Sequence, residues 1–116
     1  RMINSPDIHS IAALNDSLRK SFRSDGKQSI VALTPLVNNL FHQQEHAFFR
    51  AVADFDDFNE DNDPSGERCF GQIDYEGERY FFKIDYYARD LEQASPDPSD
   101  PEKTTRVMTI MHTSEY

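Results

Sequence analysis

The side chains most able to do chemistry are the oxygen-bearing ones of a short acidic stretch. Asp61, Asp63 and Ser65 alternate along the chain and are followed by Gly66, as in the first half of a calcium-binding loop. The bidentate glutamate that should close such a loop is missing, because Gln72 stands at its position and a proline interrupts the stretch. The sequence therefore favours an ordinary acidic turn. Asp61, Asp63 and Ser65 are the residues that would bind a metal there, and no cofactor is expected.

Three residues further upstream form a second metal-binding pattern. His42, Glu45 and His46 have the HxxEH spacing of inverted zinc proteases, in which two histidines one helical turn apart bind zinc. Such an enzyme also needs a third ligand and a substrate cleft, which a much larger chain provides. An exposed helix face explains the same three residues, and we adopt that interpretation.

Cys69 is the single cysteine, so an internal disulfide and a thiolate metal cage are both excluded. A nucleophilic role would need a base and a glycine-rich stretch to stabilise an oxyanion, and the sequence offers neither. We therefore expect a half-buried thiol on a strand.

Charge is the most informative property of the composition. Twelve basic and twenty-one acidic side chains give a net charge of −9 at neutral pH. The charge is uneven, because residues 1–50 carry a net charge of +2 and residues 51–116 carry −11. Such a field repels nucleic acid phosphates and anionic membrane surfaces and attracts basic protein surfaces. Direct binding to nucleic acid or membrane is therefore disfavoured, although acidity for solubility alone explains the same number.

The length of 116 residues predicts a single domain, residues 1–116, because two hydrophobic cores would not fit. No stretch approaches the roughly 18 apolar residues that span a bilayer, and no basic and then apolar N-terminus indicates a signal peptide. We expect a cytoplasmic protein of a bacterium, or of the host cell of a phage or plasmid.

Helical spacing of apolar residues dominates the first half of the chain. Ser5, Pro6 and Asp7 have the residue types of an N-cap and a first helical turn, and apolar residues then recur every three or four positions. Val52 and three phenylalanines predict a second inward-facing stripe. The expected elements are a helix over 6–23, a strand over 29–33, a turn or short helix from Pro35, a helix over 43–57 and a turn-rich loop over 59–66.

From Arg68 onward the period changes to two, which is typical of strands. Glu76 and Gly77 suit a two-residue hairpin turn. On the second arm, alternate residues from Tyr80 to Tyr86 are expected to share one face. Residues 88–104 contain three prolines among acids and predict a long acidic surface loop, and 107–111 form the last strand. The order of elements predicts an α+β fold: a small antiparallel β-sheet, made of the hairpin and the C-terminal strand, packed on two or three helices.

Several short runs together resemble a known family. They are Leu14-Asn15-Asp16, Asp61-Asn62-Asp63-Pro64, Gly66-Glu67, Phe70-Gly71, Lys83-Ile84-Asp85-Tyr86-Tyr87, Asp90-Leu91-Glu92, Ser95-Pro96-Asp97-Pro98, Arg106-Val107, Thr109-Ile110-Met111 and Glu115-Tyr116. Spread over most of residues 11–116, this combination resembles the small bacterial proteins grouped as domain of unknown function 3768. The resemblance implies no established activity, and it implies plasmid and phage contexts. Cys69 departs from the family pattern, in which an acid is expected.

Charge and resemblance together predict a non-enzymatic interaction protein. Its acidic face would occupy the basic groove of a nucleic-acid-binding bacterial defence complex, in the manner of an anti-CRISPR or anti-restriction protein that mimics DNA. The carboxylates expected to contact the partner form two groups: Asp54, Asp57, Glu60, Asp61 and Asp63, and then Asp74, Glu76 and Glu78.

Three alternatives remain open. One is a small metal-dependent hydrolase that uses Asp61, Asp63 and Glu67. Another is a regulatory partner of a plasmid-encoded protein. The third concerns the binding face, because tyrosines beside carboxylates also make good protein interfaces. The tyrosines are Tyr75, Tyr80, Tyr86, Tyr87 and Tyr116. Their simplest interpretation is that they belong to the sheet faces and the core.

Overall fold

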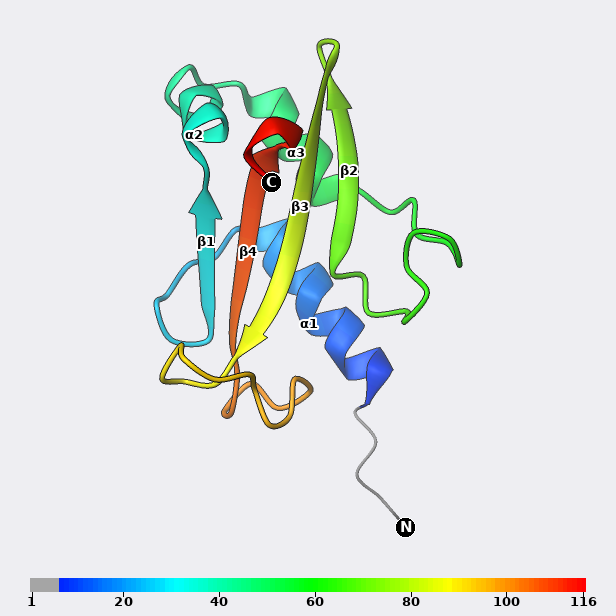
Figure 1. Cartoon of the computed structure of the whole chain (residues 1–116), viewed down its shortest axis with the longest axis vertical. Coiled ribbons are helices and arrows are strands. Elements are labelled where there is room, and N and C mark those ends of the chain that lie inside the picture. The colour runs from blue at the N-terminus through cyan, green and yellow to red at the C-terminus, as the bar shows by residue number, and fades with distance from the viewer. Residues whose placement is uncertain (1–6) are drawn as a thin grey trace.

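Three helices and four strands make up the computed structural model, which describes residues 7–116 (Figure 1). In chain order the elements are α1 (Ile8–Ser21), β1 (Ser29–Leu33), α2 (Pro35–His42), α3 (His46–Asp54), β2 (Phe70–Tyr75), β3 (Glu78–Tyr87), β4 (Thr105–His112) and a final 3-10 turn, η1 (Thr113–Glu115). The predicted α+β class is confirmed. No helix within these residues is long and apolar enough to cross a membrane.

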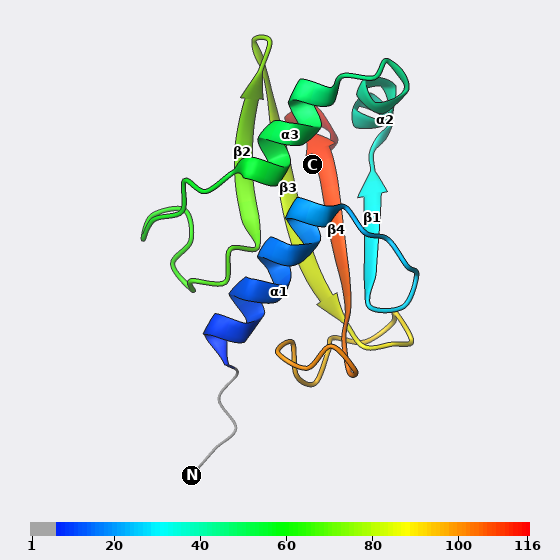
Figure 2. The ribbon, with the colours of Figure 1, turned by 180° about the vertical axis from the view of Figure 1, so that it is seen from behind.

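The sheet has the strand order β1-β4-β3-β2. The predicted antiparallel part is present, because β2 pairs with β3 and β3 pairs with β4. The sheet is nevertheless mixed, since β1 joins the far side of β4 in parallel. Strands β1 and β2 are therefore the two edges. Helices α1 and α3 lie on one face of the sheet, as the two opposite views show (Figures 1 and 2).

The core lies between this face and the helices. Alternation along β3 confirms the predicted face, because Tyr80, Phe82 and Ile84 are buried. Phe48 and Val52 of α3 pack against them and are completely buried. On β2, a Cβ atom at Gly71 would overlap the ring of Phe82, so only glycine lets the strand approach so closely.

The first helix is shorter than the predicted 6–23. Asp7 is its N-cap and accepts a hydrogen bond from the backbone N–H of Ser10, while Ser5 and Pro6 lie outside the described residues. At the other end, Phe22 adopts a left-handed conformation and donates its N–H to the carbonyl of Leu18. The helix therefore ends at Ser21, two residues before the predicted end at 23.

The prediction of one helix over 43–57 is wrong in its extent. A short helix does begin at Pro35, as one reading of the sequence had it, and α3 runs only from His46 to Asp54. Gln44 has a φ of 59°, which breaks the helical path between α2 and α3. After Asp54 the backbone becomes extended at Phe55, which brings its ring onto the sheet.

The second half follows the prediction closely. Glu76 and Gly77 form the hairpin turn, both with positive φ (50° and 81°), as the tight primed turns of hairpins require. Residues 88–104 contain turns and a single bridge, between Tyr87 and Ala94, but no named strand or helix. The last strand is longer than the predicted 107–111 because β4 pairs along most of β3.

Candidate interaction surface

The segment that follows α3 displays its acidic residues outward. Residues 54–61, called here the acidic segment, hold five carboxylates and no basic side chain. Its two phenylalanines point the other way, and the rings of Phe55 and Phe58 lie 5.5 and 6.5 Å from the ring of Phe82 in the core. Because the phenylalanines face inward, the acids are exposed: Asp54, Asp56, Asp57, Glu60 and Asp61.

Side-chain amides fix the backbone of the acidic segment. Asn59 Oδ1 accepts the N–H of Asp61 at 2.8 Å, and Asn62 Nδ2 donates to the carbonyl of Asp57 at 2.7 Å. By contrast, no hydrogen bond or ion pair from residues 7–116 reaches the carboxylates of Asp57, Glu60 or Asp61. Hydrogen bonds thus fix the backbone that carries these carboxylates, while the carboxylate oxygens make no hydrogen bond or ion pair within the described residues.

Asp63 differs from the other predicted contact residues. It is half-buried, and its Oδ1 accepts the backbone N–H of Arg68 at 3.1 Å. Asp63 thus holds the turn that leads into β2, as the sequence suggested.

The second group of predicted contact residues lies at the hairpin. Asp74 forms an ion pair with Arg79 at 3.1 Å, and Glu78 lies 2.7 Å from His112. Glu76 stands in the turn at the tip. The exposed pair of Asp74 with Arg79 contributes little to stability.

The structure brings the two acidic groups together at one place. A hollow of about 380 Å³ runs beside β2, and both Asp57 and Asp74 line it, together with Phe55, Phe70 and Gln72. Glu76 and Glu78 do not line this hollow. Of the predicted contact residues, only Asp57 and Asp74 line this hollow; the acidic segment together with Asp74 is called here the acidic edge.

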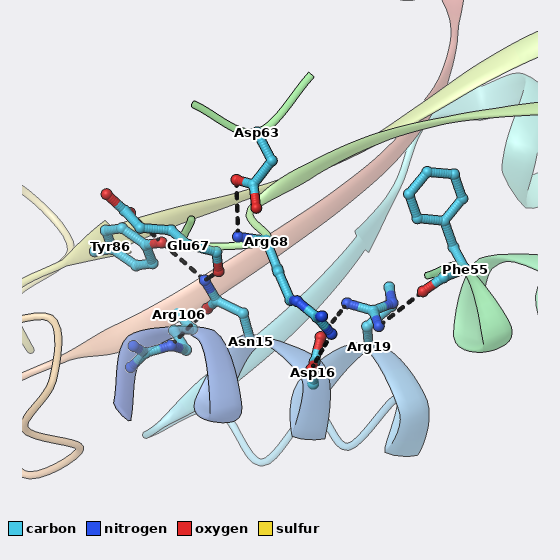
Figure 3. A network of polar contacts seen from close by, with 9 residues as sticks. All are labelled: Asn15, Asp16, Arg19, Phe55, Asp63, Glu67, Arg68, Tyr86 and Arg106. Atoms are coloured by element: carbon cyan, nitrogen blue, oxygen red, sulfur yellow. Dashed lines mark hydrogen bonds and ion pairs between the residues drawn. The ribbon is translucent and has the colours of Figure 1, made fainter. Parts of the chain in front are cut away.

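Beneath the acidic segment, a network of charged side chains ties α1 to the loop before β2 (Figure 3). Asp16 joins two arginines, with its oxygens 2.9 Å from Arg19 Nη1 and 3.0 Å from Arg68 Nη1. Both guanidinium groups also lie against the ring of Phe58, at 5.4 and 5.1 Å from its centroid. Arg19, almost wholly buried, donates from Nη2 to the carbonyl of Phe55.

The same network continues into the core through Asn15. Its Nδ2 donates to Tyr86 Oη at 2.8 Å, and its Oδ1 accepts from Arg106 Nε at 2.9 Å. Tyr86 in turn donates to a carboxylate oxygen of Glu67 at 2.7 Å. Burial, and then the bond to Glu67, raises the pKa of Tyr86, and burial lowers the pKa of Arg106.

This network is balanced in charge, because it holds three arginines, Arg19, Arg68 and Arg106, and three acids, Asp16, Asp63 and Glu67. Glu67 is engaged by Tyr86, and no three His, Cys, Asp or Glu side chains within residues 7–116 come close enough to hold a metal ion. The geometry therefore gives no support to a metal site at Asp61, Asp63 and Ser65, or to the hydrolase alternative with Glu67.

The HxxEH residues do not share a helix face, so that part of the sequence interpretation is wrong. His42 ends α2, Glu45 caps α3 and His46 begins α3. Glu45 accepts a hydrogen bond from Tyr75 at 2.5 Å, which raises the pKa of Tyr75 to about 12. Glu45 and His46 instead stand on the lining of an open apolar pocket of about 300 Å³, which aromatic rings such as those of Phe22 and Phe49 mostly form.

Cys69 is half-buried directly before β2, close to the prediction of a half-buried strand thiol. Burial, and then the charge of Glu67, raises the pKa of its thiol. The thiolate form, which is the nucleophile, is thus disfavoured at neutral pH.

The sequence placed Phe55 on the inward stripe of the helix predicted over 43–57, but it missed Phe58, the second anchor of the acidic segment. The spacing of these two phenylalanines among the acids was a readable signal for a segment anchored on the core. Nothing in the sequence pairs Asp16 with Arg68, because the contact depends on how α1 crosses the sheet.

Comparison with known proteins identifies the family. The family described as "Protein of unknown function (DUF3768)" matches residues 33–115, which is most of the chain. The chain therefore belongs to this family, and the resemblance noted from its short runs is confirmed. No curated protein and no solved structure matches the chain.

Proposed function

We propose that this protein is a non-enzymatic interaction protein whose acidic edge binds the basic, nucleic-acid-binding surface of a protein partner. The observation that carries the proposal is the acidic segment, whose five carboxylates are exposed while its two half-buried phenylalanines pack on the core. In its specific form the proposal names a bacterial defence complex of the restriction or CRISPR type as the partner, in the cytoplasm.

Competition for basic side chains is the proposed mechanism. Arginine and lysine residues that hold phosphates have to release them when a carboxylate takes their place. Carboxylates on a fixed backbone serve this purpose well, because little conformational freedom is lost when they bind. The Asn59 and Asn62 hydrogen bonds supply that fixed backbone.

Two properties of the edge favour binding over catalysis. Its free carboxylates are exposed, whereas catalytic acids and bases usually sit in a cleft that shifts their pKa. The carboxylates that the protein does engage, Asp16, Asp63 and Glu67, hold the loop in position.

A pulldown with a matched pair of variants tests the proposal. The test variant, Asp57→Asn with Glu60→Gln, removes two free charges from the acidic segment. The control variant, Glu92→Gln with Glu102→Gln, removes two exposed charges from the segment 88–104. We expect the wild-type protein and the control to retain a basic nucleic-acid-binding protein from a bacterial host and the test variant to lose it. Equal retention by both variants, or a partner with no nucleic-acid-binding surface, would contradict the proposal.

A further inference from the structure

The two edge strands of the sheet differ in whether the chain itself hydrogen-bonds to their outward-facing backbone groups. Along the first half of β1 the chain covers its own edge: Ser24 Oγ accepts the N–H of Val31, Asp25 Oδ1 accepts the N–H of Ser29, and Gly26 donates to the carbonyl of Ser29. Covering an edge in this way prevents other strands from pairing with it. Strand β2 at the opposite edge has no such cover.

The register of the hairpin shows which backbone groups of β2 are open. Cys69 O accepts the N–H of Ile84 at 2.8 Å, so hydrogen-bonded pairs recur at every second residue from there to the turn. The N–H and C=O groups of Phe70, Gln72 and Asp74 consequently point away from β3. No hydrogen bond from any other group in residues 7–116 reaches these six groups, which makes β2 a template for a further strand.

The surroundings of this edge specify the charge of the strand that fits. The hollow beside β2 is lined by Asp57 and Asp74, and Asp57 has no ion-pair partner in the described chain. A second copy of this protein would bring the same carboxylates against each other. A segment rich in lysine or arginine would instead neutralise them.

We propose that an extended basic segment of the partner protein pairs with the open edge of β2 and adds a fifth strand to the sheet. This inference rests on the proposed function and specifies how the partner is bound. The backbone bonds to Phe70, Gln72 and Asp74 set the register. The carboxylate of Asp57, which has no ion-pair partner in the described chain, selects basic side chains, and Asp74 adds a second acceptor where a basic residue displaces Arg79.

Three synthetic peptides test the pairing on the intact protein. The first alternates lysine and valine over eight residues, the second has the same sequence with N-methylated backbone nitrogens, and the third carries glutamate in place of lysine. We expect the first peptide to bind at least tenfold more tightly than either of the others, by fluorescence anisotropy, and to protect the amides of Phe70, Gln72 and Asp74 from hydrogen exchange.

A pair of substitutions at one position gives an independent readout. Gln72→Pro removes an N–H that faces the open edge and that the hairpin does not use, and Gln72→Ala keeps it. The proline variant should lose at least tenfold in affinity for the lysine peptide and the alanine variant should keep it. Equal binding of the plain and N-methylated peptides would overturn strand pairing and leave the charge-based function intact. Failure of the lysine peptide to bind would also overturn strand pairing, whereas the proposed function fails only in the pulldown.

Discussion

Asp57, on the segment after α3, and Asp74, on the edge strand β2, line the same hollow although they belong to different elements. Their proximity follows from two packing events. Phe55 turns the chain onto the core directly after α3, and Gly71 lets β2 pack close to the ring of Phe82. Hydrophobic packing thus places two carboxylates from different elements on the lining of one hollow.

The complex with the partner should weaken as salt concentration rises. Exposed charges are screened over about 8 Å at physiological ionic strength, so the attraction between the acidic edge and a basic surface falls when salt is added. Isothermal titration at several salt concentrations measures the slope. The Asp57→Asn/Glu60→Gln variant should show a shallower slope than wild type, and an affinity that does not change with salt would contradict electrostatic recognition.

Removing the carboxylate of Asp16 should destabilise the protein. Arg19 is 1 % exposed and would keep its charge without a counter-charge, which costs about 3 kcal/mol, the lower end of the effect of breaking a buried ion pair. We expect Asp16→Asn to lower the free energy of unfolding by about that amount in urea denaturation. Asp85→Asn is the control, since its ion pair with Lys83 is over one-third exposed and should contribute less than about 1 kcal/mol.

How far the sequence predicts this fold depends on the range of the interactions involved. The hairpin at Glu76 and Gly77 follows from local turn chemistry and alternation, and the structure confirms it. The parallel pairing of β1 with β4 could not be predicted, because residues far apart in the chain determine it. The start of α3 was placed three residues too early, at 43, because only Ala47 is apolar between Phe41 and Phe48, and apolar spacing therefore does not mark the left-handed turn at Gln44.

The candidate site likewise contains some features that the local sequence predicts and others that depend on long-range contacts. The exposure of Asp54, Asp57, Glu60 and Asp61 could be predicted, because their positions lie outside the apolar stripe that packs inward. The ion pair of Asp74 with Arg79 follows from the register that the Glu76-Gly77 turn imposes. The contact of Glu78 with His112 depends instead on the pairing of β3 with β4, and that of Asp16 with Arg68 on the crossing of α1. Such contacts cannot be derived from spacing along the chain.

Raising the pH above about 10 should lower the free energy of unfolding of the wild-type protein by more than that of a Tyr86→Phe variant. The pKa of Tyr86 in the folded protein is raised above its ordinary value of 10.0, mainly by burial. A raised folded-state pKa means that this contribution is fully present below about pH 10 and is lost as pH rises further. At neutral pH the variant should lose about 1 to 3 kcal/mol, because Asn15 and Glu67 lose a hydrogen-bond partner.

Urea denaturation between pH 7 and 11 measures both effects. Wild type should lose stability steeply above pH 10, and Tyr86→Phe should lose less over the same interval. If the free energy of unfolding fell equally with pH in the two proteins, Tyr86 would not be the group that causes the loss of stability at alkaline pH. Tyr75→Phe is a useful comparison, since its hydroxyl binds the carboxylate of Glu45 at the other end of the sheet.

Anchoring, and not charge alone, should determine how well the acidic segment binds. Phe58 lies against the guanidinium groups of Arg19 and Arg68 and against the ring of Phe82. Phe58→Ala leaves the net charge unchanged but removes this half-buried anchor, at about 2 kcal/mol, which is less than the loss of a fully buried phenylalanine costs. We expect faster hydrogen exchange of the amides in residues 57–68 and at least tenfold weaker partner binding, with the exchange protection of β3 and β4 retained. Phe58→Leu keeps an apolar anchor and should bind more tightly than Phe58→Ala. If Phe58→Ala loosens the segment and still binds as well as wild type, the fixed display of the carboxylates is not part of recognition.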